Sequence, residues 1–162
     1  MNFSTIRWPL DLNPKNSPVY AHNELKMSLN PSVVWAWLIR ATKWHEWYQN
    51  CKDLKIVEGK SKVDLSPGSI FTWKTFGMKV TTQIKVFEPF TQLAWRGSGL
   101  LGTGYHVWLI QQAKNGCRVT TEEVQNGFVI SIGRLQIKRM LLKQHQNWLI
   151  GLSEMPKRGL PH

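Results

Sequence analysis

The hydrophobic positions between residues 51 and 126 alternate with polar ones in short runs. Such alternation, with a period of two, is typical of half-buried strands. The pattern predicts six strands, over residues 51–58, 69–75, 79–88, 92–98, 102–113 and 117–126. The breaks are turn residues, namely Ser66-Pro67-Gly68, Gly77, Glu88-Pro89 and Asn115-Gly116. Because the connections are short, we expect an antiparallel meander.

The segment before these runs predicts a further strand and a helix start. Residues 19–29 alternate in the same way, which indicates a first strand. Asn30 follows as a helix-capping residue, with Pro31 at the first helical position. We therefore expect a short helix over residues 31–39 and a second short helix over residues 42–49.

The two short helices carry four tryptophans within seventeen residues. In the second helix, Trp44, Trp47 and Tyr48 have the spacing of a single face. In the first helix Trp35 belongs to the apolar face, whereas Trp37 falls off it and is expected to be partly exposed. We interpret the tryptophan cluster as a brace that holds both helices across one end of the sheet.

The last part of the chain changes to a helical period. From about Phe128 to Met155 the apolar residues fall within one wide arc, which predicts a long helix buried along one side. The arc contains Ile130, Ile137, Leu141, Trp148, Leu152 and Met155. Gly133 and Gly151 lie near one edge of it. Their missing side chains leave room for another molecule or permit a close helix crossing, and both alternatives remain open.

The order of elements predicts an α+β architecture. The expected order is one strand, two short helices, six strands and one long helix. A curved seven-stranded antiparallel sheet wrapped around the C-terminal helix accommodates this order, because the apolar faces of the sheet and the helix can bury each other. Residues 1–18 have three prolines and no clear period, so we expect an extended N-terminal arm. Residues 19–158 are then expected to form a single domain, in agreement with the chain length of 162 residues.

The alternation also sorts side chains by face. In the last hairpin, two registers place either Trp108 or His106 opposite Glu123, and both put these residues on one face. That face carries no lysine or arginine, so we expect it to be the interior. The predicted inner face has aromatic and aliphatic walls with polar insertions. It comprises Asn23, Phe71, Trp73, Thr75, Thr82, Leu93, Trp95, His106, Trp108, Thr121 and Glu123.

Aromatic walls with a few convergent polar groups are typical of a ligand pocket. Burying a histidine or a carboxylate without a partner costs several kcal/mol, so His106 and Glu123 need an explanation. Three explanations remain open. The two side chains form hydrogen bonds with each other or with a backbone group in a packed core, they line a cavity, or they act as a catalytic acid and base. His145, on the helix arc, is interpreted as a packed histidine.

The composition adds charge to this picture. The chain has 21 Lys+Arg against 10 Asp+Glu, a formal net charge of +11, and nine tryptophans. Such a balance is consistent with nucleic acid, an anionic membrane surface or an acidic ligand as partner, and also with a plain solvated basic surface. The local excess lies in residues 129–158, whose basic members are Arg134, Lys138, Arg139, Lys143, Lys157 and Arg158.

Several classes of site lack their motifs. Cys51 and Cys117 belong to no CxxC or Cys/His cluster, so we expect neither a disulfide framework nor a metal site. No phosphate-binding loop, dinucleotide fingerprint or nucleophile elbow is present, and we expect no cofactor. The N-terminus lacks the apolar run of a signal peptide and no stretch approaches 18 apolar residues, which favours a cytoplasmic protein.

Taken together, the motifs resemble the SRPBCC superfamily, in particular bacterial members described as polyketide cyclase/dehydrase or lipid-transport-like. The resemblance covers nearly the whole chain. It is carried by LNPSVVWAWLIRATKWHEWYQNC, PGSIFTWKTFGMKV, FEPFTQLAWRGSG, GCRVTTEEVQNG and KQHQNWL. It implies a helix-grip fold, related to START domains and birch-pollen-allergen-like proteins, with a hydrophobic cavity between the sheet and the long helix. No catalytic signature of the family carries over to this chain.

The first functional hypothesis is the binding of a hydrophobic or aromatic small molecule, such as a lipid or a polyketide-like compound. The alternative is a cyclase or dehydratase in which His106 is the general base and Glu123 orients it. A third class, a basic protein that binds nucleic acid, is disfavoured by the burial expected for most tryptophans, although a transient contact with an anionic membrane remains open. The expected ligand-binding residues are Phe71, Trp73, Thr75, Thr82, Leu93, Trp95, His106, Trp108, Thr121, Glu123, Ile137, Leu141 and Trp148.

Overall fold

The computed structural model describes residues 6–162, so the first five residues of the expected arm lie outside the described residues. The strands are β1 (Val19–Met27), β2 (Lys52–Glu58), β3 (Ile70–Thr75), β4 (Met78–Glu88), β5 (Gln92–Gly99), β6 (Gly102–Ala113) and β7 (Gly116–Asn126). The helices are α1 (Pro31–Ile39), α2 (Phe128–Ile132), α3 (Arg134–Glu154) and the 3-10 helices η1 (Ala41–Glu46) and η2 (Met155–Arg158).

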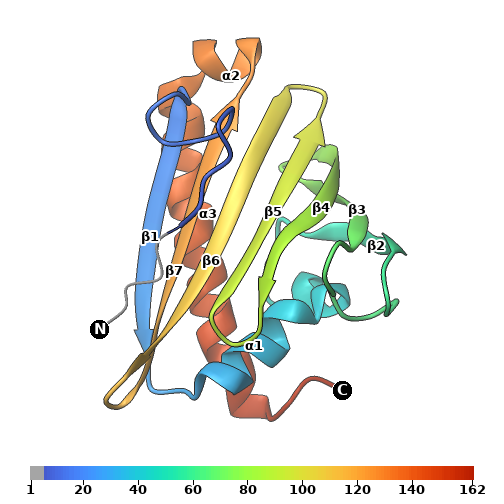
Figure 1. Ribbon diagram of the computed structural model, residues 1–162, viewed down its shortest axis with the longest axis vertical. Coiled ribbons are helices and arrows are strands. Elements are labelled where there is room, and N and C mark those ends of the chain that lie inside the picture. The colour runs from blue at the N-terminus through green and yellow to red at the C-terminus, as the bar shows by residue number, and fades with distance from the viewer. Residues whose placement is uncertain (1–5) are drawn as a thin grey trace.

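The strands of residues 6–162 form one seven-stranded antiparallel sheet in the order β1-β7-β6-β5-β4-β3-β2. Figure 1 shows α3 running along one face of the sheet and α1 crossing below its lower end. Strands β2 to β7 follow one another as the expected meander, and β1 pairs with β7 at the far side. The expected helix-grip architecture is confirmed.

The start of α1 follows the local chemistry that the sequence indicated. The side chain of Asn30 accepts a hydrogen bond from the backbone N–H of Ser32 at 2.9 Å, and Pro31 occupies the first helical turn. An N-cap of this kind satisfies one of the otherwise unpaired amides of the first turn. Val34 and Leu38 of the same helix are fully buried.

Two predictions for the aromatic segment are corrected. The second helix is a short 3-10 helix that ends at Glu46, instead of an α-helix over 42–49. Trp37 is 5% exposed, so the prediction of partial exposure is wrong. Its indole N–H donates to the carbonyl of Gly159 at 2.9 Å, because the chain after α3 returns to α1. The spacing of apolar residues within a helix does not report a tertiary contact of this kind.

The long C-terminal helix is interrupted, which corrects the prediction of one continuous helix from Phe128. Gly133 has φ −87° and ψ 11°, outside the α-helical region, and separates α2 from α3. At the other end, a Cβ on Gly151 would lie 2.4 Å from the carbonyl oxygen of Trp47. Of the two alternatives for Gly151, the close crossing is the one observed, because α3 and the chain after η1 touch there.

The two faces of the sheet bury different groups. The face toward α3 holds the larger core, in which Trp44 contacts the rings of Phe71, Trp73, Trp95 and Trp148. The opposite face holds a smaller core, where Leu12 of the N-terminal segment is fully buried against strands β5, β6 and β7. In Figure 1 this segment lies over the side of the sheet that faces away from α3. Within the described part of the chain, no helix is long and apolar enough to cross a membrane.

Candidate functional site

The register of the last hairpin places the candidate site residues. Ala113 pairs with Gly116, and His106 consequently pairs with Glu123. Of the two registers that the sequence left open, this is the one with His106 opposite Glu123. Both side chains face α3, which brings them within reach of a third residue, His145, on the buried side of that helix.

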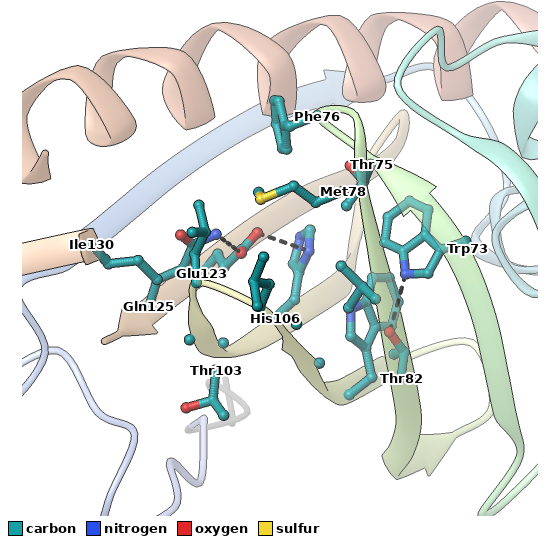
Figure 2. A pocket seen from close by; sticks show the side chains of 18 of the residues that line it. Trp73, Thr75, Phe76, Met78, Thr82, Thr103, His106, Glu123, Gln125 and Ile130 are labelled. Carbon is teal, nitrogen blue, oxygen red and sulfur yellow. Dashed lines mark hydrogen bonds and ion pairs between the residues drawn. The ribbon is translucent and has the colours of Figure 1, made fainter. Parts of the chain in front are cut away.

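A cavity with space of about 110 Å³ lies between the sheet and α3, at the end of the sheet near α2 (Figure 2). Strands β3 to β7, the turns β3–β4 and β5–β6, and helices α2 and α3 provide its walls. Predicted site residues that line it are Trp73, Thr75, Thr82, Trp95, His106, Glu123 and Trp148. Its aromatic walls and convergent polar groups are those of a small-molecule pocket.

The other predicted site residues do not line this cavity and lie in packed regions. Phe71, Leu93 and Trp108 are fully buried in the main core. Thr121 is fully buried beside the cavity, hydrogen bonded to His106. Ile137 and Leu141 pack in a separate cluster against the start of β1. The sequence therefore predicts which residues share the inner face of the sheet, whereas the cavity occupies only one end of that face.

Four glycines explain why the hollow lies at that end. On β5 and β6, Trp95 and His106 form one inward-facing pair. The next two inward-facing pairs are glycines, Gly97 opposite Gly104 and Gly99 opposite Gly102. All four glycines line the cavity. Because a glycine has no side chain, space remains where the aromatic wall stops. The alternating glycines in GSGLLGTG are visible in the sequence, but the hollow was not predicted from them.

Further lining residues, on the turns, the helices and the ends of strands β4, β6 and β7, were not predicted from the sequence. They are Tyr48, Phe76, Met78, Val80, Leu100, Leu101, Thr103, Gln125, Ile130 and His145. The alternation of strands cannot assign turn residues to a face, and Tyr48 and Ile130 were assigned only to apolar faces. Figure 2 shows Phe76 and Met78 between α3 and the sheet, with Ile130 to one side of them and Trp73 to the other.

The polar side of the cavity is a cluster of His106, Glu123 and His145, here called the His–Glu–His cluster. One carboxylate oxygen of Glu123, Oε2, lies 3.2 Å from Nδ1 of His106 and 3.0 Å from Nε2 of His145. The amide of Gln125 donates to the other oxygen, Oε1, at 2.6 Å. His106 Nε2 lies 2.6 Å from the hydroxyl of Thr121. Two of the alternatives for His106 and Glu123 thus hold together: they contact each other and they line the cavity.

The protonation of the cluster follows from its burial and its contacts. Burial lowers the pKa of His106 to about 3, although the nearby Glu123 carboxylate acts in the opposite direction. Burial would raise the pKa of Glu123, but the two histidine rings and the hydrogen bond from Gln125 lower it to about 2. At neutral pH, His106 is therefore neutral and Glu123 is ionised, so the cavity presents a carboxylate to its contents.

Exposed apolar side chains lie on the β5–β6 turn and on helices α2 and α3, which also contribute walls to the cavity; this end of the cavity is here called its mouth. Leu100, at the tip of the β5–β6 turn, is 94% exposed, and Phe128 on α2 is 81% exposed. Ile132 and Leu135 continue this surface onto the start of α3. Exposed basic residues follow on the same helix, namely Arg134, Lys138 and Arg139. Large apolar side chains left exposed on neighbouring elements often mark an interaction site.

Comparisons with known proteins bear on the fold. No protein-family model matches the chain, and a search of curated proteins gives no match. Among solved structures, hypothetical protein jhp0584 from Helicobacter pylori is 27% identical, with a TM-score of 0.86, over 96% of this chain and 98% of that one. The di-domain ARO/CYC StfQ from the steffimycin biosynthetic pathway is 14% identical, with a TM-score of 0.72, over 86% of this chain and 51% of StfQ.

A further similar structure is Ara h 8.0201, which is 11% identical, with a TM-score of 0.69, over 86% of this chain and 98% of its own. At these identities StfQ and Ara h 8.0201 establish the shared fold, and what each of them binds or makes is a property of that protein. The observed strand order and the long C-terminal helix agree with both. The resemblance to the SRPBCC superfamily is thus confirmed at the level of the fold: the chain has the helix-grip fold of that superfamily.

Proposed function

We propose that the protein binds a hydrophobic or aromatic small molecule, a lipid or a polyketide-like compound, in the cavity between the sheet and α3. The observation that carries the proposal is a cavity with tryptophan walls and one buried carboxylate. An apolar cavity of about 150 Å³ accommodates one benzene ring. A space of about 110 Å³ is smaller, so it suits a short alkyl segment or part of one ring, and the rest of a larger ligand would extend to the mouth.

The polar wall predicts one feature of the ligand. Glu123 is ionised and accepts hydrogen bonds, and its Oε1 atom has a single donor among the described residues, Gln125. A ligand hydroxyl would find an acceptor there, because a carboxylate oxygen accepts more than one hydrogen bond. The tryptophans Trp73 and Trp95 would lie against the apolar part of the same ligand. We therefore expect a ligand with a hydroxyl group at the end that enters first.

The cyclase or dehydratase alternative has weaker support. Both ring nitrogens of His106 have partners, Glu123 at one and Thr121 at the other. The ring would have to give up a hydrogen bond before it could take a proton from a ligand. Glu123, with a pKa of about 2, is a weak base at neutral pH, whereas efficient general bases have pKa values near the working pH. Binding is therefore the function that we propose.

Blocking the cavity is expected to abolish binding. Val80 lines the cavity from β4, and Val80→Phe would place a ring in the available space. We expect the affinity for the neutral fluorescent probe 2-naphthol, whose hydroxyl can donate to Glu123, to fall at least about tenfold, the equivalent of about 1.4 kcal/mol. The matched control is Val57→Phe on β2, where the valine is 47% exposed and outside the cavity. Equal affinities of the two variants would contradict the proposal.

We also propose that the mouth docks on an anionic membrane surface, from which a lipid-like ligand would enter. The exposed apolar residues would insert, and Arg134, Lys138 and Arg139 would lie at the level of the anionic headgroups. Nucleic acid is a poor alternative, because Trp37, Trp44, Trp108 and Trp148 are buried and cannot stack on bases. Cys51 and Cys117 are free and buried, which fits the proposed cytoplasmic location.

Vesicle flotation tests this docking. Binding to phosphatidylcholine vesicles that contain phosphatidylserine is expected, and it should weaken as salt is raised. Ile132→Ser should reduce the bound fraction, because it removes apolar surface at the mouth. Ile150→Ser is the matched control, since Ile150 is an exposed isoleucine further along α3. Salt-independent binding, or equal effects of the two substitutions, would rule out docking through the mouth.

A further inference from the structure

The His–Glu–His cluster brings together three side chains of the types that ligate transition metals. The candidate ligand atoms of His106, Glu123 and His145 all lie within 4.8 Å of one another. They come from β6, β7 and α3, so the fold assembles the site from segments far apart in the sequence. His106 and His145 are nearly completely buried, and Glu123 is partly buried. If Glu123 only accepted a hydrogen bond from each histidine, each of its two oxygens could face one ring. In the structure both histidine rings face the same oxygen, Oε2.

We infer that His106 Nδ1, His145 Nε2 and a carboxylate oxygen of Glu123 form a binding site for one divalent first-row transition-metal ion. The inference does not depend on the proposed hydrophobic ligand.

The distances between the ligand atoms fit such an ion. Zinc lies about 2.0–2.2 Å from histidine nitrogen and carboxylate oxygen, so two ligands of a tetrahedral site are separated by ~3.3 Å. The two measured separations from Glu123 Oε2 are 3.2 Å to His106 and 3.0 Å to His145. The third separation, between the candidate nitrogens of the two histidines, is within 4.8 Å, so the histidine side chains would have to close on the ion.

The neighbouring residues support metal ligation by the correct nitrogens. Histidine ligands usually donate their second N–H to an oxygen, which fixes the tautomer. For His106 that oxygen is the Thr121 hydroxyl, 2.6 Å from Nε2. Gln125 holds the second oxygen of Glu123 at 2.6 Å and so orients the carboxylate. His145 Nδ1 has no partner within residues 6–162, so it is free to carry the ring proton once an ion takes the place of the Nε2 proton that faces Glu123.

The donor set narrows the class of ion. Two imidazoles and one carboxylate suit zinc and ferrous iron better than calcium or magnesium, which prefer oxygen ligands alone. Three protein ligands leave at least one coordination position, and because all three residues line the cavity, that position would face its interior. A water molecule, or an oxygen atom of a molecule in the cavity, would complete the coordination.

Cobalt titration of the chelator-treated full-length protein tests the inference, since Co²⁺ reports its coordination by visible absorption and Zn²⁺ competes for the same ligands. We expect one ion per chain. Glu123→Gln and His145→Gln should each weaken binding at least about tenfold, the loss that removal of even a supporting residue produces. The matched control is His22→Gln, which removes a histidine that lies 2.9 Å from a carboxylate, Glu122, with no third candidate ligand among residues 6–162.

The outcomes separate cleanly. Stoichiometric binding that is lost in both cluster variants and retained in His22→Gln supports the site. Absence of stoichiometric Co²⁺ and Zn²⁺ binding by the wild-type protein overturns it, and this result needs no variant. Unchanged affinity in a variant that circular dichroism shows to be folded overturns it as well. Probe binding by the metal-free protein is measured separately, so failure of the metal site leaves the proposed ligand cavity intact.

Discussion

Replacing Trp148 with alanine is expected to lower the free energy of unfolding by about 3–5 kcal/mol, the range for buried tryptophan or phenylalanine truncations. Trp148 is 1% exposed and lies at the centre of the aromatic core. Its ring stacks on Tyr48 at 4.1 Å between centroids and meets Trp44 and Trp108 edge-on, each at 5.1 Å. Truncation would remove apolar burial, leave a void and break the contact between α3, η1 and the sheet.

Urea unfolding followed by circular dichroism measures this effect. The control is Phe128→Ala, which also removes an aromatic ring but at a position that is 81% exposed. Surface substitutions of this kind usually change stability by no more than about 0.5 kcal/mol. If Trp148→Ala cost no more than Phe128→Ala, α3 would not be held by the aromatic core that Trp148 forms here.

Acidification from pH 7 to pH 4 is expected to destabilise the metal-free protein by roughly 3 kcal/mol through His106 alone. The pKa of His106 is lowered to about 3 in the folded state from a model value of 6.5. Between these two values the unfolded chain binds a proton that the folded chain does not, so stability is lost as the pH falls. Glu123, with its pKa lowered to about 2 from 4.5, adds a loss in the same direction below about pH 4.5.

The measurement is urea unfolding at several pH values in the presence of a chelator. In the wild type, the His106 contribution has a slope of about 1.4 kcal/mol per pH unit below pH 6. His106→Gln should show a slope smaller by that amount, since it lacks the titrating ring. His22→Gln serves as the control, because His22 is 44% exposed on the side chain and lies on the other face of the sheet. Equal slopes in the wild type and His106→Gln would show that the His106 ring is not held neutral by burial.

Much of the fold was accessible from sequence because its determinants are local. Alternation with a period of two located the strands within a few residues of their observed bounds, and the Asn30-Pro31 pair located the start of α1. Alternation also fixes which side chains share a face, whichever register a hairpin adopts. For that reason His106 and Glu123 were assigned to the same inner face before their pairing was known.

The features that were missed depend on contacts between distant segments. Trp37 is buried because the chain after α3 reaches α1, and no periodicity within residues 31–39 reports this contact. Gly133 interrupts the C-terminal helix where α2 turns over the end of the sheet. A helical pattern continues smoothly through a single glycine, so the sequence pattern does not register the break.

The sequence by itself determined the order of the elements, the helix-grip architecture and the two polar residues on the inner face, because these depend on local periods of two and 3.6 residues. The tertiary structure alone decided where the inner face is hollow and which third residue joins His106 and Glu123. The hollow depends on two pairs of glycines that become opposite one another only when β5 and β6 pair. His145 joins the cluster because the rotation of α3 about its own axis is set by packing against the whole sheet, and no local pattern encodes that angle.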